Sequence, residues 1–170
     1  MTAFVALLRA VNVGGTGKLP MSDLKAMCEK LGFTKVQTYI ASGNVVFESR
    51  KSEGSVKAAL EAALQKYAGK PVGVLVRTPA ELAKVVAGNP FPKLPTKWTV
   101  ALFLDEAPPA DTLSTVRGAN GEEVRLGKRE IYVHYGSGMA RSKLRIPAAV
   151  AGTARNMNTV AKLAELGAKL

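Results

Sequence analysis

The chain contains two short apolar runs of nearly the same sequence, and similar patterns follow each of them. Val5–Leu8 reads VALL and Val100–Phe103 reads VALF. Continuous apolar runs of this length are typical of strands buried on both faces. A helical pattern, two strand patterns joined by a turn, and a second helical pattern follow each run. This order predicts an α+β protein of two ferredoxin-like repeats (split βαβ, βαββαβ-type), with mixed sheets and helices packed on one face.

Hydrophobic spacing predicts the elements of the first half. Leu24, Met27, Cys28 and Leu31 follow a helical period, and Ser22 before them is a suitable N-cap. A hairpin is expected over 36–48, and a further strand over 72–77. Between them, one apolar stripe predicts a helix that ends at Gly69–Pro71; its members are Val56, Ala59, Leu60, Ala63, Leu64 and Tyr67.

The second half is expected to repeat this plan. Thr78–Glu81 is a capping box with proline at the first helical position, and it predicts a short helix. A helix from Pro109 to Val116, a hairpin over 122–135 and a C-terminal helix are expected to follow. The predicted boundaries are a first βαββαβ repeat at 1–78, a connecting helix and Pro-rich linker at 79–96, and a second βαββα repeat with the C-terminal helix at 97–170.

Composition limits the classes of protein that fit. The 170 residues are 47% hydrophobic and include a single cysteine, Cys28, which favours a cytoplasmic protein without disulfides. No apolar stretch approaches the roughly 20 residues that span a bilayer, so no membrane partner is expected. The net charge is +11, and residues 125–170 contain nine Lys or Arg against two acids. Such an excess favours anionic partners or serves solubility.

Three polar segments stand out against the apolar elements: Arg9–Gly15, Ser42–Asn44 and Thr153–Thr159. Side chains that converge from distant parts of a chain are a common way to form a pocket. Lys18 follows the first segment, and Lys143 lies in a second glycine-containing stretch. The predicted ligand-binding residues are Arg9, Asn12, Gly14, Gly15, Lys18, Ser42, Gly43, Asn44, Lys143, Arg155, Asn156 and Asn158. The asparagines, the glycines and Ser42 also have a structural interpretation as turn or cap residues.

The sequence lacks the motifs of several well-known chemistries. Gly14–Lys18 follows a strand, but the residue after Lys18 is Leu19, where a P-loop needs Ser or Thr. One histidine and one cysteine cannot form a usual zinc site, so we expect no metal and no cofactor. His134 is interpreted as a partly exposed strand residue. The catalytic residues therefore stay unknown, as does whether the protein is an enzyme.

Five stretches together resemble a bacterial family of unknown function, number 1697 among the domains of unknown function. They are ALLRAVNVGG at 6–15, LGF at 31–33, TYIASGNVVF at 38–47, SGMARSKL at 137–144 and TARNMNTVAKL at 153–163. The resemblance implies a cytoplasmic bacterial protein with a duplicated βαββαβ fold and brings no activity. This chain has Ala10 where the family usually has glycine, and Met157 where it often has tryptophan.

Three functions remain open at this stage. The first is binding or processing of a small anionic ligand, such as a phosphorylated one, where the three polar segments meet. The second is a structural or protein-interaction module whose Asn and Arg side chains tie the repeats together. The third, and least favoured, is electrostatic nucleic-acid binding through the basic C-terminal third. The sequence does not predict an oligomeric state.

Overall fold

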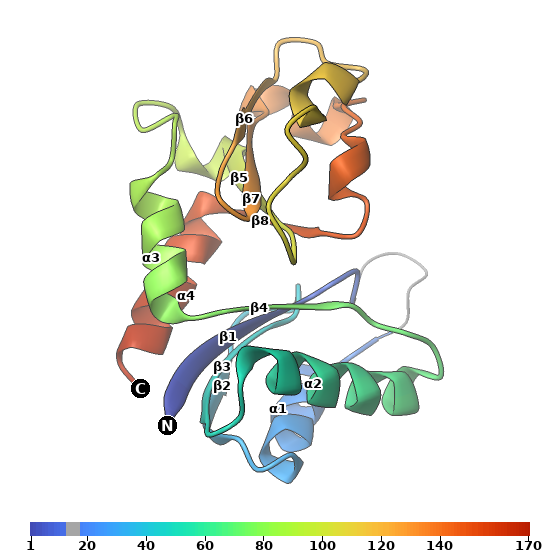
Figure 1. The fold of residues 1–170 in the computed structure, drawn as a ribbon, viewed down its shortest axis with the longest axis vertical. Helices are drawn as coiled ribbons and strands as arrows, with labels where there is room; N and C mark the ends of the chain where they lie inside the picture. The colour runs from blue at the N-terminus through green and yellow to red at the C-terminus, as the bar shows by residue number, and fades with distance from the viewer. Residues whose placement is uncertain (13–17) are drawn as a thin grey trace. The chain divides into compact units, whose positions relative to one another are not determined.

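The computed structural model describes residues 1–12 and 18–170. The chain forms two compact units, one of Met1–Leu82 with Leu163–Leu170 and the other of Ala83–Lys162. Each unit contains one four-stranded sheet, and every pairing between the named strands is antiparallel (Figure 1). The predicted α+β class and the plan of two similar halves are confirmed. The repeat boundaries predicted at 78, 79–96 and 97 stay a prediction, because compact units are defined by contacts and not by repetition.

The first unit has the element order βαββαβ. Its strands are β1 (Thr2–Leu8), β2 (Thr34–Thr38), β3 (Asn44–Ser49) and β4 (Val74–Arg77), and they lie in the order β2-β3-β1-β4. Strands joined through a helix are not neighbours, because another strand separates β1 from β2 and β3 from β4. This arrangement is why the sheet is antiparallel where we expected a mixed one.

Two helices cover one face of the first sheet. They are α1 (Met21–Lys30) and α2 (Glu53–Ala68), which lie against the same side of the strands in Figure 1. Alternate residues of β1, such as Phe4, Ala6 and Leu8, share one core cluster with Leu24 of α1 and Leu60 of α2. The apolar faces of both helices and the alternate residues of β1 therefore pack together in one buried layer.

The helix ends follow local chemistry. Ser52 caps α2 by accepting a 3.2 Å hydrogen bond from Ser55 N, and Gly69 ends it with a left-handed φ of 72°. For α1 the predicted cap is wrong, because Pro20 occupies the N-cap position without a side-chain bond. The capping box is confirmed at α3 (Pro79–Ala87), where Glu81 N donates to Thr78 Oγ1 and Thr78 N donates to Glu81 Oε1.

The second unit repeats the strand order of the first, but different elements cover its sheet. Its strands are β5 (Thr99–Phe103), β6 (Glu123–Leu126), β7 (Glu130–His134) and β8 (Thr153–Asn156), in the order β6-β7-β5-β8. Short 3-10 segments pack on its core face, in place of long helices: Thr112–Thr115, Gly136–Arg141 and Pro147–Ala149. A further 3-10 turn, Thr96–Trp98, precedes β5, and α4 (Met157–Ala168) follows β8.

The helix predicted from Pro109 to Val116 is wrong, because only Thr112–Thr115 is helical and it is a 3-10 segment. Three hydroxyls there donate to carbonyl oxygens three residues earlier: Thr112 to Pro109, Ser114 to Asp111 and Thr115 to Thr112. Such bonds compete with the backbone bonds of an α-helix. The strand β8 (Thr153–Asn156) was not predicted from the sequence.

Candidate functional site

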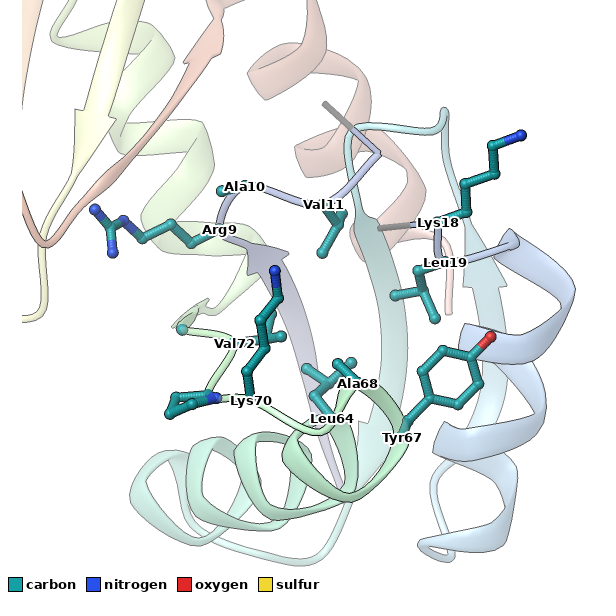
Figure 2. A pocket seen from close by; sticks show the side chains of 12 residues that line it. Arg9, Ala10, Val11, Lys18, Leu19, Leu64, Tyr67, Ala68, Lys70 and Val72 are labelled. Atoms are coloured by element: carbon teal, nitrogen blue, oxygen red, sulfur yellow. The ribbon is translucent and has the colours of Figure 1, made fainter. Parts of the chain in front are cut away.

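The first unit contains a pocket of about 620 Å³ at the end of β1. Residues 9–11 after β1, Lys18–Leu19, the last turn of α2 and the stretch 70–73 before β4 line it (Figure 2). The last turn of a helix and the end of a strand meet here because α2 must reverse at Gly69 to deliver β4 beside β1. Two of the predicted ligand-binding residues, Arg9 and Lys18, line this pocket.

The floor of the pocket is apolar and its rim is cationic. Leu19 and Leu64 are buried beneath it. Arg9, Lys18 and Lys70 are exposed at its edge, and no carboxylate is among the twelve lining residues. Figure 2 shows Arg9 and Lys18 extending in opposite directions, with Lys70 between them. The rim therefore presents a broad positive field to solvent, not one tight cluster.

Tyr67 adds a hydroxyl to the rim. The sequence placed it on the buried stripe of α2, but its side chain is 48% exposed and lines the pocket. Its hydroxyl donates a 2.7 Å hydrogen bond to Asp23 Oδ2 of α1. This bond and the charge of Asp23 raise the pKa of Tyr67, because both favour the protonated phenol. The hydrogen bond to Asp23 thus joins the pocket rim to α1.

Asn12 organises the loop beside the pocket. Its Nδ2 donates to Leu19 O and to Ala41 O, each at 2.8 Å, and its Oδ1 accepts from Leu19 N at 2.7 Å. Ala10 and Asn12 both have left-handed backbones, with φ of 55° and 54°. The Asn12 amide is therefore engaged by the protein backbone and acts on the pocket through Leu19.

The segment Ser42–Asn44 lies next to this loop and does not line the pocket. A Cβ at Gly43 would lie 2.6 Å from Val11 Cγ2, and its φ is 92°. Leu8 N donates to Gly43 O at 2.8 Å, so the turn is joined to the end of β1. The buried Asn44 amide donates to Tyr39 O and Ser42 Oγ, each at 2.9 Å.

The remaining predicted residues lie elsewhere. Gly14 and Gly15 fall outside the described residues. Lys143, Arg155, Asn156 and Asn158 belong to the second unit. The three polar segments divide between the two units, so their predicted convergence stays a prediction.

In the second unit, the polar segment is built into β8 and the start of α4. Arg155 is 7% exposed and donates from Nη1 to Thr153 Oγ1 and Ala154 O, each at 2.9 Å. Burial lowers the pKa of its guanidinium to about 10. Asn156 Oδ1 accepts from Thr159 N at 2.9 Å, which caps α4. Asn158 Oδ1 accepts from Thr96 Oγ1 at 2.7 Å.

The family model described as "Protein of unknown function (DUF1697)" matches residues 1–132. The chain belongs to this family. The matched range contains every residue that lines the first-unit pocket. No protein with a curated description matches the chain significantly.

A solved structure has the same fold as this DUF1697 chain. It is the conserved bacterial protein SP0830 from Streptococcus pneumoniae, with 23% sequence identity and a TM-score of 0.79. The alignment covers 97% of this chain and 98% of the other. At this identity the likeness shows the fold alone.

The described residues of this DUF1697 chain offer few reactive groups. Burial and, to a smaller extent, the charge of Glu29 raise the pKa of the Cys28 thiol to about 12, so the thiol stays protonated in the core. His134 Nδ1 lies 2.8 Å from Thr99 Oγ1 on the neighbouring strand. Within residues 1–12 and 18–170, no three His, Cys, Asp or Glu side chains gather as metal ligands. No helix in the same ranges is long and apolar enough to cross a membrane.

Two pocket residues escaped the sequence analysis. Lys70 follows the end of α2, and a cation between a helix-ending glycine and a proline is the signal that could have identified it. Tyr67 fits the apolar period of α2, so periodicity alone assigned it to the core. The available clue was its position in the last turn of α2, where side chains on the apolar face extend past the edge of the sheet.

Proposed function

We propose that the first-unit pocket binds a small anionic ligand that also has an apolar part. The observation that carries this proposal is the lining: three cations, no carboxylate, and an apolar floor around about 620 Å³. Pockets for small molecules commonly combine an apolar wall with a few polar groups that fix orientation. A phosphate or carboxylate at the rim, with a hydrocarbon or ring against Leu19 and Leu64, satisfies both halves of the lining.

The charges at the rim support an anion over a neutral ligand. Lys18 and Lys70 form no ion pair with any residue in the described part of the chain. Three nearby cations repel one another, and an anion that binds among them relieves this repulsion. The Tyr67 hydroxyl donates its hydrogen bond to Asp23, which holds the Tyr67 ring in place at the rim of the pocket.

Phenyl phosphate is a suitable first probe because it joins a phosphate to an apolar ring. Its titration should be followed by amide chemical shifts, with inorganic phosphate and phenol as the two part-ligands. We expect saturable shifts at Leu19, Ala68 and Gly73, and weaker binding of each part-ligand. Shifts confined to other regions would reject this pocket as the site.

Variants then assign the contribution of charge. Lys18→Ala and Lys70→Ala should each weaken phenyl phosphate binding about 1.5- to fivefold, the range for exposed charge pairs. Lys66→Ala is the matched control, because Lys66 is exposed on α2, carries the same charge and does not line the pocket. An equal loss in the control would show that net charge, and not the pocket, attracts the probe.

A structural role is the second candidate, and it is supported for the asparagines. The amides of Asn12 and Asn44 donate to backbone or hydroxyl oxygens within the first unit. A ligand would have to compete with these bonds. Under a purely structural role, substitutions at Asn12 would lower stability while pocket variants left all probe binding unchanged.

We also propose that each half is a ferredoxin-like repeat and that the protein is cytoplasmic and bacterial. The shared strand order of the two sheets supports the repeats. The single, buried cysteine supports a reducing compartment. The matching fold from Streptococcus pneumoniae supports a bacterial source. Fractionation of the native host with antibody to this chain would test the location.

A further inference from the structure

The second unit has its own hollow, separate from the ligand pocket proposed above. Its volume is about 280 Å³, and it is lined by Gly118, Asn120, Glu122, Tyr135, Gly138, Arg141, Ser142 and Lys143. Two loops that are distant in sequence form it, one after Arg117 and the other after β7. Lys143 is the one predicted ligand-binding residue that it includes.

The two loops are fixed to each other by an isolated bridge. Arg117 N donates to Arg145 O at 2.9 Å, and Arg145 N donates to Arg117 O at 2.7 Å. A Cβ at Gly118 would collide with Lys143 O, and the φ of Gly118 is 73°. Glycine is therefore required where the backbones cross. Backbone contacts therefore hold the rim of the hollow in place.

Two cations form this bridge and two more line the hollow beside it. Arg117, Arg141, Lys143 and Arg145 are all exposed, and we call them the basic strip. Residues opposite each other in a bridge, and residues two apart in an extended segment, share one face. Arg117 and Arg145 oppose each other in the bridge and so share one face, and Arg141 and Lys143 line the adjoining hollow.

The cations of the basic strip are not paired with carboxylates in the described part of the chain. None of its four side chains forms an ion pair with any residue that the structure describes. Guanidinium groups of Arg117 and Arg145 donate to nearby backbone carbonyls, which orients them and leaves their charge unneutralised. Glu122, which lines the hollow, accepts hydrogen bonds from Ser142 Oγ and Asn120 N.

The hollow beside the basic strip offers contacts that suit a nucleobase. Tyr135 contributes an aromatic ring, while Asn120 and Glu122 contribute amide and carboxylate groups. Single-stranded nucleic acid is recognised by unstacked bases that contact aromatic rings and polar side chains, with cations on the backbone. A paired base in a duplex cannot enter such a hollow. A row of cations also fits a row of phosphates better than it fits one compact anion.

We propose that the second unit binds single-stranded nucleic acid, with backbone phosphates on Arg117, Arg141, Lys143 and Arg145 and one unstacked base in the hollow beside Tyr135. The ionised Glu122 carboxylate keeps phosphates out of the hollow and on the strip, because like charges repel. Its hydrogen bonds from Ser142 and Asn120 lower its pKa and so keep it ionised. The proposal is independent of the small-ligand pocket in the first unit.

Fluorescence anisotropy with the whole chain tests this proposal. The probes are fluorescein-labelled 12-residue oligo(U) and oligo(dT), a 12-base-pair duplex, and vesicles containing phosphatidylserine, each between 50 and 300 mM KCl. For four phosphate contacts on a single strand, the log–log salt slope should be about −3. Absence of oligonucleotide binding at 50 mM KCl overturns the proposal, as does binding to the vesicles alone.

Charge-matched variants locate the contact. The combined variant R117Q/R141Q/K143Q/R145Q should lose at least about tenfold in affinity and most of the salt slope. K25Q/K30Q/K51Q/K66Q removes the same charge from exposed lysines of the first unit that line neither pocket, and should stay within about threefold. Equal losses in both variants overturn the proposal.

Two further variants guard against misfolding and test the base. R141Q/K143Q changes side chains that make no hydrogen bond within the described chain, so it should keep the wild-type melting temperature and lose about half of the slope. Tyr135→Leu should weaken single-strand binding and leave both the duplex affinity and the salt slope unchanged. Unchanged single-strand affinity in Tyr135→Leu would overturn the base-binding part.

Discussion

The side-chain amide of Asn12 donates a 2.8 Å hydrogen bond to the carbonyl oxygen of Ala41, which lies 29 positions further along the chain. The same amide also donates to Leu19 O and accepts from Leu19 N. One side chain thus joins Leu19 to the β2–β3 turn. Because Leu19 forms the pocket floor, the stability of this junction and the shape of the pocket are linked.

Asn12→Ala should lower the free energy of unfolding by about 2–3 kcal/mol, because three polar partners in a partly buried junction lose their bonds. Asn12→Gly loses the same bonds but accepts the left-handed backbone, so it should be about 1 kcal/mol more stable than Asn12→Ala. Urea unfolding measures both. Equal stability of the two variants would contradict a role for the φ of 54°.

Ala10→Gly should stabilise the protein by about 1 kcal/mol. Ala10 has a φ of 55°, where an L-residue with a Cβ is strained and glycine is not. Ala58→Gly, at an exposed position inside α2, is the control and should destabilise by about 1 kcal/mol. Thermal unfolding should show a higher melting temperature for Ala10→Gly and a lower one for Ala58→Gly.

Gly43→Ala should destabilise the first unit by at least about 2 kcal/mol. The added methyl would lie 2.6 Å from Val11 Cγ2 and 2.9 Å from Leu8 Cβ, at a φ of 92°. The double variant Gly43→Ala/Val11→Ala removes one of these contacts and should be more stable than the sum of its single variants predicts.

Gly54→Ala is the control for Gly43→Ala. Gly54 lies in the first turn of α2, and a Cβ there meets nothing within 4 Å. This change should therefore stabilise the protein by up to about 1 kcal/mol, measured by the same urea titration.

If the effects of Gly43→Ala and Val11→Ala on the free energy of unfolding are additive, steric contact between these residues is not the cause of the destabilisation.

Cys28 should make stability fall at alkaline pH. Burial raises the pKa of its thiol from 9.0 to about 12, so above pH 9 the unfolded chain ionises while the folded chain does not. The contribution is complete below pH 9 and is lost as pH rises towards 12. Between pH 9 and 10 the wild type should lose about 1 kcal/mol relative to Cys28→Ala. Parallel stability curves of the two proteins would contradict this assignment.

The sequence was most informative where one physical signal controlled the structure. The apolar stripe of α2, the Thr78–Glu81 capping box and the two apolar runs each correspond to observed elements. Each signal is local and strong, and the core needs the same residues that local propensity favours. This agreement explains why the fold class could be predicted.

The failures arose where local and tertiary effects differ. Thr153–Asn156 is too short and polar to suggest a strand, and it becomes β8 through pairing with β5, for example between Thr153 and Phe103. Hydroxyl groups of Thr112, Ser114 and Thr115 turned a predicted helix into a 3-10 segment.

For the candidate site, the sequence identified Arg9 and Lys18 but missed Lys70 and Tyr67. Residue type marked the first two as unusual at the end of an apolar strand. The others became neighbours of these residues only through the packing of α2 beside β1, which no local pattern encodes. Likewise, the asparagines were recognised as unusual, but their backbone partners depend on the folded loops.

The division of the chain into units has a consequence for biosynthesis. The first unit is completed by residues 163–170, where a Cβ at Gly167 would lie 2.5 Å from Pro79 Cγ and 3.5 Å from Val5 Cγ2. The segment Ala83–Lys162 therefore leaves the ribosome before the first unit can close. Until then, the nascent chain exposes apolar surface around β1 that chaperones can bind. A nonsense codon after Lys162 would remove residues 163–170. It would therefore destabilise the first unit, most of which is synthesised first.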